Sequence, residues 1–184
     1  MRSKPAARAL VGVLVIACGN PLRGDDAAGP EVGDALATLL EGTGATVIVT
    51  HQLLPELADD VSRAHRIVFV DAAAGRPAGS VSVSPLAAPQ LVSGERSRHT
   101  PGGDLEEGRA LVPFSHGMGP ADVLALARDL YSATPEALLV SVGAAGFEPG
   151  AALSPAVRRA LPDAVHAAHL AILAGASAGN GSDA

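Results

Sequence analysis

A strand, turn and helix near the N-terminus, residues 11–32, constrain the fold of this 184-residue chain more than any other stretch. They begin with the apolar run VGVLVI, which is rich in β-branched residues and typical of a strand buried on both faces of a parallel sheet. Gly19 and Asn20 end the strand because both tolerate the positive φ of a sharp turn. The turn carries Asp25 and Asp26, which are predicted at the lip of the crevice where open α/β sheets bind ligands.

Strands and helices alternate along the rest of the chain. Apolar residues at helical spacing predict a helix over 29–41, followed by a short strand at 45–50. A helix at 53–64 and a buried strand at 66–71, RIVFVD, continue the alternation, which is typical of a doubly wound α/β fold. The remaining predicted elements are an edge strand at 80–84, a helix beginning at 120, a buried strand at 137–142 and a closing helix from 154 to about 174.

The length predicts a single domain. A chain of 184 residues is long enough for one substantial core and too short for two ordinary ones. We assign the domain to residues 1–176 and expect the small, polar segment 177–184 to be a disordered tail. Residues 92–108 mix glycines with charges and lack apolar periodicity, so they are predicted to form a long mobile loop.

Charge and composition argue against nucleic acid as a partner. The chain has 13 basic and 19 acidic residues, a formal charge of −6, and only 2% aromatic residues. A polyanion would be repelled, and there are few side chains on which bases could stack. The single cysteine, Cys18, excludes an internal disulfide and agrees with a reducing cytoplasm.

The N-terminus superficially resembles a bacterial lipoprotein signal. Arg2, Lys4 and Arg8 precede an apolar run that ends at Cys18. That run is short for a signal, however, and cleavage before Cys18 would remove the first strand. No stretch approaches the roughly 20 apolar residues of a transmembrane helix. We therefore expect a soluble cytoplasmic protein without a membrane partner.

Three polar positions follow strands or precede a helix. The pair Asp25 and Asp26 follows the first strand, Asp71 ends the third, and His116 precedes the helix at 120. Such positions converge on one edge of a doubly wound sheet. Two carboxylates and an imidazole with an open position suit a divalent transition metal such as Ni, Zn, Cu or Fe. The alternative is that Asp26 caps the following helix, Asp71 caps its own turn and His116 is an ordinary loop residue.

Other kinds of site fit less well. The stretch GNPLRGDDAAG lacks the glycine spacing and the lysine of phosphate-binding loops, and its aspartates would repel an anion. No serine-hydrolase elbow is present. Cys18 is interpreted as a small buried hydrophobe, and His51 follows the second strand on the same predicted edge as Asp71. No role is assigned to the remaining histidines, which are His65, His99, His166 and His169.

Several short motifs occur in a characteristic order between residues 11 and 173. They are Gly19-Asn20 with Asp25-Asp26 and Gly29, the strand ending at Asp71, Ser115-His116-Gly117 with Pro120-Ala121-Asp122-Val123-Leu124, and Phe147-Glu148-Pro149 with Leu153-Ser154-Pro155. In this order and spacing, the chain resembles the hydrogenase maturation proteases, the nickel-dependent endopeptidases that trim the large subunit of nickel–iron hydrogenases.

The resemblance implies a fold, a site and a reaction. The fold is a three-layer α/β sandwich with a twisted, mainly parallel sheet and helices on both faces. Asp26, Asp71 and His116 are implied as the catalytic, metal-binding trio, with Asp25 either orienting a ligand or capping the helix. The implied reaction is a single cut that removes a C-terminal extension from the nickel-loaded large-subunit precursor. Nickel then belongs to the substrate, where it either marks a completed insertion or assists cleavage by polarising the scissile carbonyl or activating water.

Two segments depart from the family pattern. The turn at 51–55, HQLLP, stands where many members have a glycine-rich turn, and the loop at 92–108 is distinctive. We expect these segments to select the particular large subunit. We also expect a monomer or weak homo-oligomer. Two alternatives remain open, a non-catalytic chaperone of the same fold that binds precursor or metal, and a peptidase for an unrelated precursor.

Overall fold

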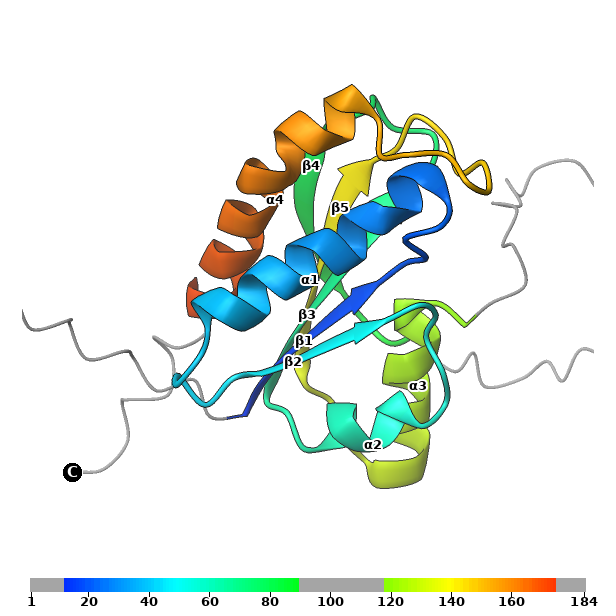
Figure 1. Cartoon of the computed structure of the whole chain (residues 1–184). Coiled ribbons are helices and arrows are strands. Elements are labelled where there is room, and N and C mark those ends of the chain that lie inside the picture. The colour runs from blue at the N-terminus through cyan, green and yellow to red at the C-terminus, as the bar shows by residue number, and fades with distance from the viewer. Residues whose placement is uncertain (1–11, 90–117, 175–184) are drawn as a thin grey trace, which may run out of the picture.

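A five-stranded sheet forms the centre of the molecule. The computed structural model describes residues 12–89 and 118–174 (Figure 1). Within them, the sheet has the order β2-β1-β3-β5-β4. The strands are β1 (Val13–Cys18), β2 (Thr46–Thr50), β3 (Arg66–Ala73), β4 (Val81–Leu86) and β5 (Glu136–Gly143). β2, β1, β3 and β5 pair in parallel, whereas β4 pairs antiparallel with β5 at one edge.

Helices cover both faces of this sheet. A 3₁₀ turn, η1 (Gly24–Ala27), leads into α1 (Ala28–Leu39), which lies with α4 (Pro155–Ala174) on one face. The other face carries α2 (Leu57–Ser62) and α3 (Pro120–Tyr131), which pack against each other. Figure 1 shows these two pairs on opposite sides of the strands. The predicted α/β sandwich with a mainly parallel sheet is therefore confirmed.

The alternation of side chains in β1 explains the two cores. Val13, Val15 and Ala17 belong to the core under α1 and α4, whereas Leu14 and Ile16 belong to the core under α2 and α3. Successive strand residues point to opposite faces, so a run that is apolar throughout buries both faces.

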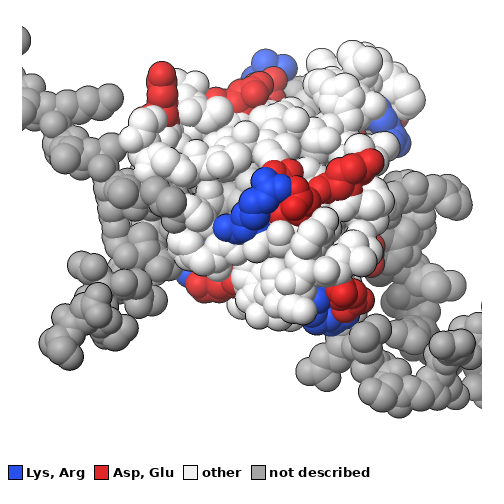
Figure 2. Space-filling model, turned by 90° about the horizontal axis from the view of Figure 1, so that it is seen from below, with Lys and Arg blue, Asp and Glu red and all other residues white. Residues whose placement is uncertain are grey.

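Figure 2 shows one face of the molecule, on which the basic side chains lie beside acidic ones and form no continuous basic surface among the residues drawn in colour.

The element boundaries differ from the prediction at two places that concern the site. The helix expected at 53–64 is reduced to α2, because Leu53 instead forms an isolated antiparallel bridge with Met118. The strand expected to end at Asp71 continues to Ala73, because β5 provides pairing partners up to Gly143. The predicted loop at 92–108 and tail at 177–184 lie outside the described residues.

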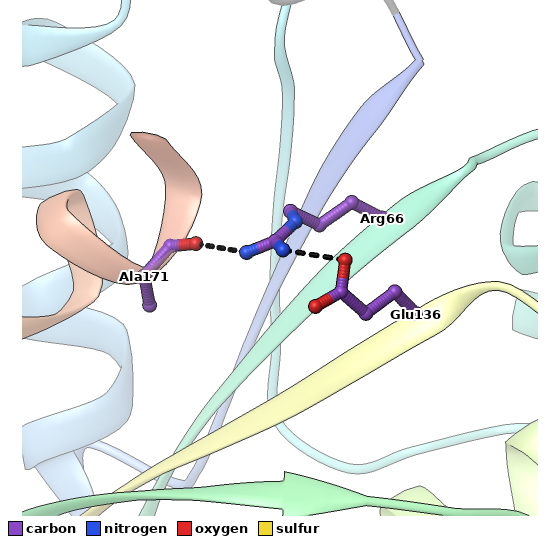
Figure 3. A network of polar contacts seen from close by, with 3 residues as sticks. All are labelled: Arg66, Glu136 and Ala171. Atoms are coloured by element: carbon purple, nitrogen blue, oxygen red, sulfur yellow. Dashed lines mark hydrogen bonds and ion pairs between the residues drawn. The ribbon is translucent and has the colours of Figure 1, made fainter. Parts of the chain in front are cut away.

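A buried arginine lies at the end of the sheet where β3 begins, opposite to the end that carries Asp71. Arg66, the first residue of β3, donates hydrogen bonds to the Ala171 carbonyl of α4 and to the Glu136 carboxylate at the start of β5 (Figure 3). The guanidinium therefore joins a helix to two strands.

None of the helices in the described ranges is both long and apolar enough to cross a membrane.

Candidate functional site

The turn after β1 folds back on the carboxylate of Asp26. Gly19 adopts a φ of +147°, and a Cβ at this position would overlap the Asp26 carbonyl. The Asn20 N–H donates to Asp26 Oδ2 at 3.0 Å, and Asn20 Oδ1 accepts the Leu22 N–H at 2.9 Å. Neither η1 nor α1 has a side-chain cap, so the alternative in which Asp26 caps the following helix is wrong. Its carboxylate is instead held at the end of β1.

Asp71 lies on the neighbouring strand at the same edge of the sheet. Asp71 directly follows Val70 in β3, and Val70 pairs with Ala17 near the end of β1. Burial, together with the nearby negative charge of Asp26, raises the pKa of Asp71 to about 7, although the Ala72 N–H donates to Asp71 Oδ1 at 2.8 Å and acts in the opposite direction. The structure thus brings Asp26 and Asp71 close enough for their charges to repel.

Cys18 is a third member of this neighbourhood. It is the last residue of β1 and is only half-buried, so the interpretation as a small core residue is incomplete. Burial and the charges of Asp71 and Asp26 raise the pKa of its thiol to about 12, so the thiol is protonated at neutral pH. The sequence could have indicated this place for Cys18, because it directly precedes Gly19. The last residue of a strand lies at the same edge of the sheet as the turn that follows the strand.

Asp25 faces away from this pair and is 1% exposed. Its Oδ2 accepts the Ala145 N–H at 2.7 Å, and its Oδ1 accepts the Ser154 N–H at 2.6 Å. Burial alone would raise the pKa of Asp25, but these hydrogen bonds outweigh burial and leave the pKa below its ordinary value. Asp25 therefore neither caps the helix nor lines the space between Asp26 and Asp71; it ties the turn to the loop after β5.

The predicted histidines do not complete a metal site in the described part of the chain. His116 and His99 lie outside it, and His51 is exposed after β2. His65 lies against Gly12 at the opposite end of the sheet, and His166 and His169 lie on α4. Within residues 12–89 and 118–174, no three Cys, His, Asp or Glu side chains are grouped as a metal would require. Met118, the first residue described after the gap, pairs with Leu53 beside Cys18.

Two cavities among the described residues are lined by neither Asp26 nor Asp71. A cavity of about 160 Å³ lies beside Asp25 and is lined also by Glu148 and Ser154. A larger one of about 390 Å³ lies between β4, α3 and the beginning of β5, at the opposite end of that strand from Gly143. The candidate site is defined by the carboxylates of Asp26 and Asp71 at this edge of the sheet.

No family model and no curated protein sequence matches the chain. Solved structures do match it over most of its length. The [NiFe] hydrogenase maturation protease HycI from Thermococcus kodakarensis aligns with a TM-score of 0.65 and 16% identity, over 91% of this chain and 93% of that protein.

Two further structures give the same result. The hydrogenase-maturating endopeptidase HybD from Escherichia coli aligns with a TM-score of 0.62 and 22% identity, over 89% and 93% of the two chains. A hydrogenase 2 maturation peptidase from a Thaumarchaeota archaeon gives 0.58 and 24%, over 88% and 97%. The resemblance inferred from the motifs is confirmed for the fold: this chain has the α/β fold of the hydrogenase maturation proteases.

Proposed function

We propose that this protein is a cytoplasmic endopeptidase that removes a C-terminal extension from the nickel-loaded large-subunit precursor of a nickel–iron hydrogenase. The observation that carries the proposal is the pair Asp26 and Asp71, which stand at the carboxyl edge of two adjacent parallel strands and whose charges interact, in a sheet whose fold is that of maturation proteases. Ligands of open α/β sheets bind at this edge.

The electrostatics of the pair favour a cation between the carboxylates. Burial is the main cause of the raised pKa of Asp71 and the charge of Asp26 adds to it, so a bound cation would stabilise the ionised carboxylates. In the proposed complex the cation is nickel, held by the precursor, to which Asp26 and Asp71 offer oxygen ligands. His116 is proposed as the third ligand, and the pairing of Met118 with Leu53 returns the chain to this edge two residues later.

Recognition of nickel then makes cleavage conditional on its insertion. A precursor without metal would present only its own groups to two carboxylates that repel each other, so it would bind poorly. Once the nickel is engaged, the scissile bond is held beside a Lewis acid that polarises a carbonyl or activates a water molecule. The protein supplies the oxygen ligands and the position of the peptide.

The test is cleavage of nickel-loaded precursor by the purified protein, followed by mass spectrometry. Asp26→Ala, Asp71→Ala and His116→Ala should each abolish the mass shift, whereas Asp34→Ala, which removes an exposed carboxylate from α1, should cleave at the wild-type rate. Full activity of all three site variants would reject the assignment. Tight binding of the precursor by the wild-type protein with no change of mass would instead indicate a chaperone.

A further inference from the structure

We propose that Asp25 is a positioning residue that fixes the Asp26 carboxylate by tying the turn before α1 to the loop between β5 and α4. The role assigned to Asp26 rests on the proposed function, but the structural coupling does not. The two segments are far apart in the chain: Ala145 and Ser154, which donate to Asp25, are separated from it by 120 and 129 residues. Figure 1 shows the blue turn before α1 next to the yellow and orange loop that follows β5.

The two segments are joined by backbone hydrogen bonds as well. The Asp25 N–H donates to the Gly146 carbonyl at 3.1 Å, and the Gly24 N–H donates to the Ala151 carbonyl at 3.1 Å. In the other direction, the Gly150 N–H donates to the Leu22 carbonyl at 2.7 Å. Because the bonds run both ways, the turn cannot shift along the loop without breaking several of them.

This anchorage acts directly on Asp26. Asp25 and Asp26 are adjacent in the 3₁₀ turn η1, where successive side chains project roughly 120° apart. Asp25 therefore faces the loop while Asp26 faces the end of β1, where the Asn20 N–H binds its Oδ2. A turn that is fixed on one side presents the second carboxylate in a defined direction on the other, which is what a metal ligand requires.

The chemistry of Asp25 suits this role in a way that an amide does not. Each carboxylate oxygen of the buried Asp25 accepts one backbone N–H, so the group satisfies two donors with its two oxygens. Asparagine has the same shape but carries an NH₂ in place of one oxygen, and that NH₂ would face an N–H donor. Asp25→Asn therefore breaks one of the two side-chain contacts without changing the volume.

The experiment compares the full-length wild type, Asp25→Asn and the control Asp34→Asn, which changes an exposed residue of α1. The first readout is amide hydrogen exchange by NMR. We expect the Asn20 amide, whose partner is Asp26, to exchange about tenfold faster in Asp25→Asn. Amides in the middle of β3, such as that of Val68, should keep their wild-type rates in both variants. The second readout is cleavage of nickel-loaded precursor, with a lower kcat/KM in Asp25→Asn than in the wild type and Asp34→Asn.

The outcomes separate the two proposals. If exchange rises at Ala145 and Ser154 but not at Asn20, Asp25 merely staples the loop and the positioning role is wrong. If the wild-type protein cleaves no precursor, the proposed function fails, while the Asn20 rate still decides the positioning role. If Asp25→Asn does not fold, Ser154→Ala is the second variant; it removes a hydroxyl that bonds Asp25 and also accepts the Val157 N–H at 3.3 Å in the first turn of α4. That variant should give a smaller increase at Asn20, and an unchanged rate there would overturn the proposal.

Discussion

Replacing Arg66 by methionine should lower the free energy of unfolding by about 2 kcal/mol. Arg66 is 4% exposed, and its Nη1 donates to the Ala171 carbonyl at 2.5 Å in the last described turn of α4. Methionine fills the space of the aliphatic stem but leaves that carbonyl without its charged donor. The substitution also removes a cation from the C-terminal part of a helix, where the helix dipole favours positive charge.

The magnitude follows from the unequal exposure of the two partners. A buried hydrogen bond from a charged donor contributes about 1.5 to 3 kcal/mol. The Glu136 side chain, which accepts from Nη2, is 59% exposed, so water screens this ion pair and its contribution is at most about 1 kcal/mol. Glu136→Gln should therefore cost less than half as much as Arg66→Met.

Urea unfolding followed by circular dichroism measures both variants, and thermal unfolding should show Arg66→Met melting about 4–8 °C below the wild type. Arg63→Met is the matched control, because that arginine is exposed on the surface and pairs with Asp59 nearby in the chain. It should change the free energy of unfolding by less than about 0.5 kcal/mol. If Glu136→Gln is as destabilising as Arg66→Met, or if Arg66→Met is as stable as the wild type, the contact with α4 is not the stabilising one.

Two predictions concern the edge that carries the aspartates. Because burial raises the pKa of Asp71 to about 7, the folded state binds its proton more tightly than the unfolded chain does. Wild-type stability should thus fall as the pH rises from about 4 to about 7, and Asp71→Asn should lose this fall in urea titrations at several pH values; equal slopes would contradict it. Cys18, with its pKa raised to about 12, should react with iodoacetamide at pH 8 at least about tenfold more slowly when folded than in urea, as measured by mass spectrometry, and equal rates would refute its protonated state.

The fold was predictable because local patterns decide it. The apolar run of β1 and the run ending at Asp71 indicate strands that are buried on both faces, and this needs no knowledge of their partners. The short segment around Ser82, bounded by glycine and proline, was correctly predicted as an edge strand. The helix predicted at 53–64 was too long because periodicity does not reveal that Leu53 pairs with Met118 across a long stretch of chain.

The site was predictable only where the topology alone fixes it. Asp26 follows β1 and Asp71 lies near the end of β3, and these strands are adjacent and parallel, so the alternation of strands and helices places both residues at one edge of the sheet. The role of Asp25 depends on N–H groups more than a hundred residues away, and no spacing rule connects a turn to a loop at that distance. The place of His116 in the site stays a prediction, because it lies outside the described residues.

The division of β1 between two cores gives the candidate site two independent supports. Asp26 is carried by the turn that leads into α1, so its position depends on the core shared by α1 and α4. Leu53 and Met118, which pair with each other on the other side of the site, belong to the core of α2 and α3. In the described part of the chain, the two cores lie on opposite faces of the sheet. Substitutions in one core can thus reshape one side of the site while the other side keeps its geometry. Under the proposed function, such a scaffold can acquire a new precursor without losing its carboxylates.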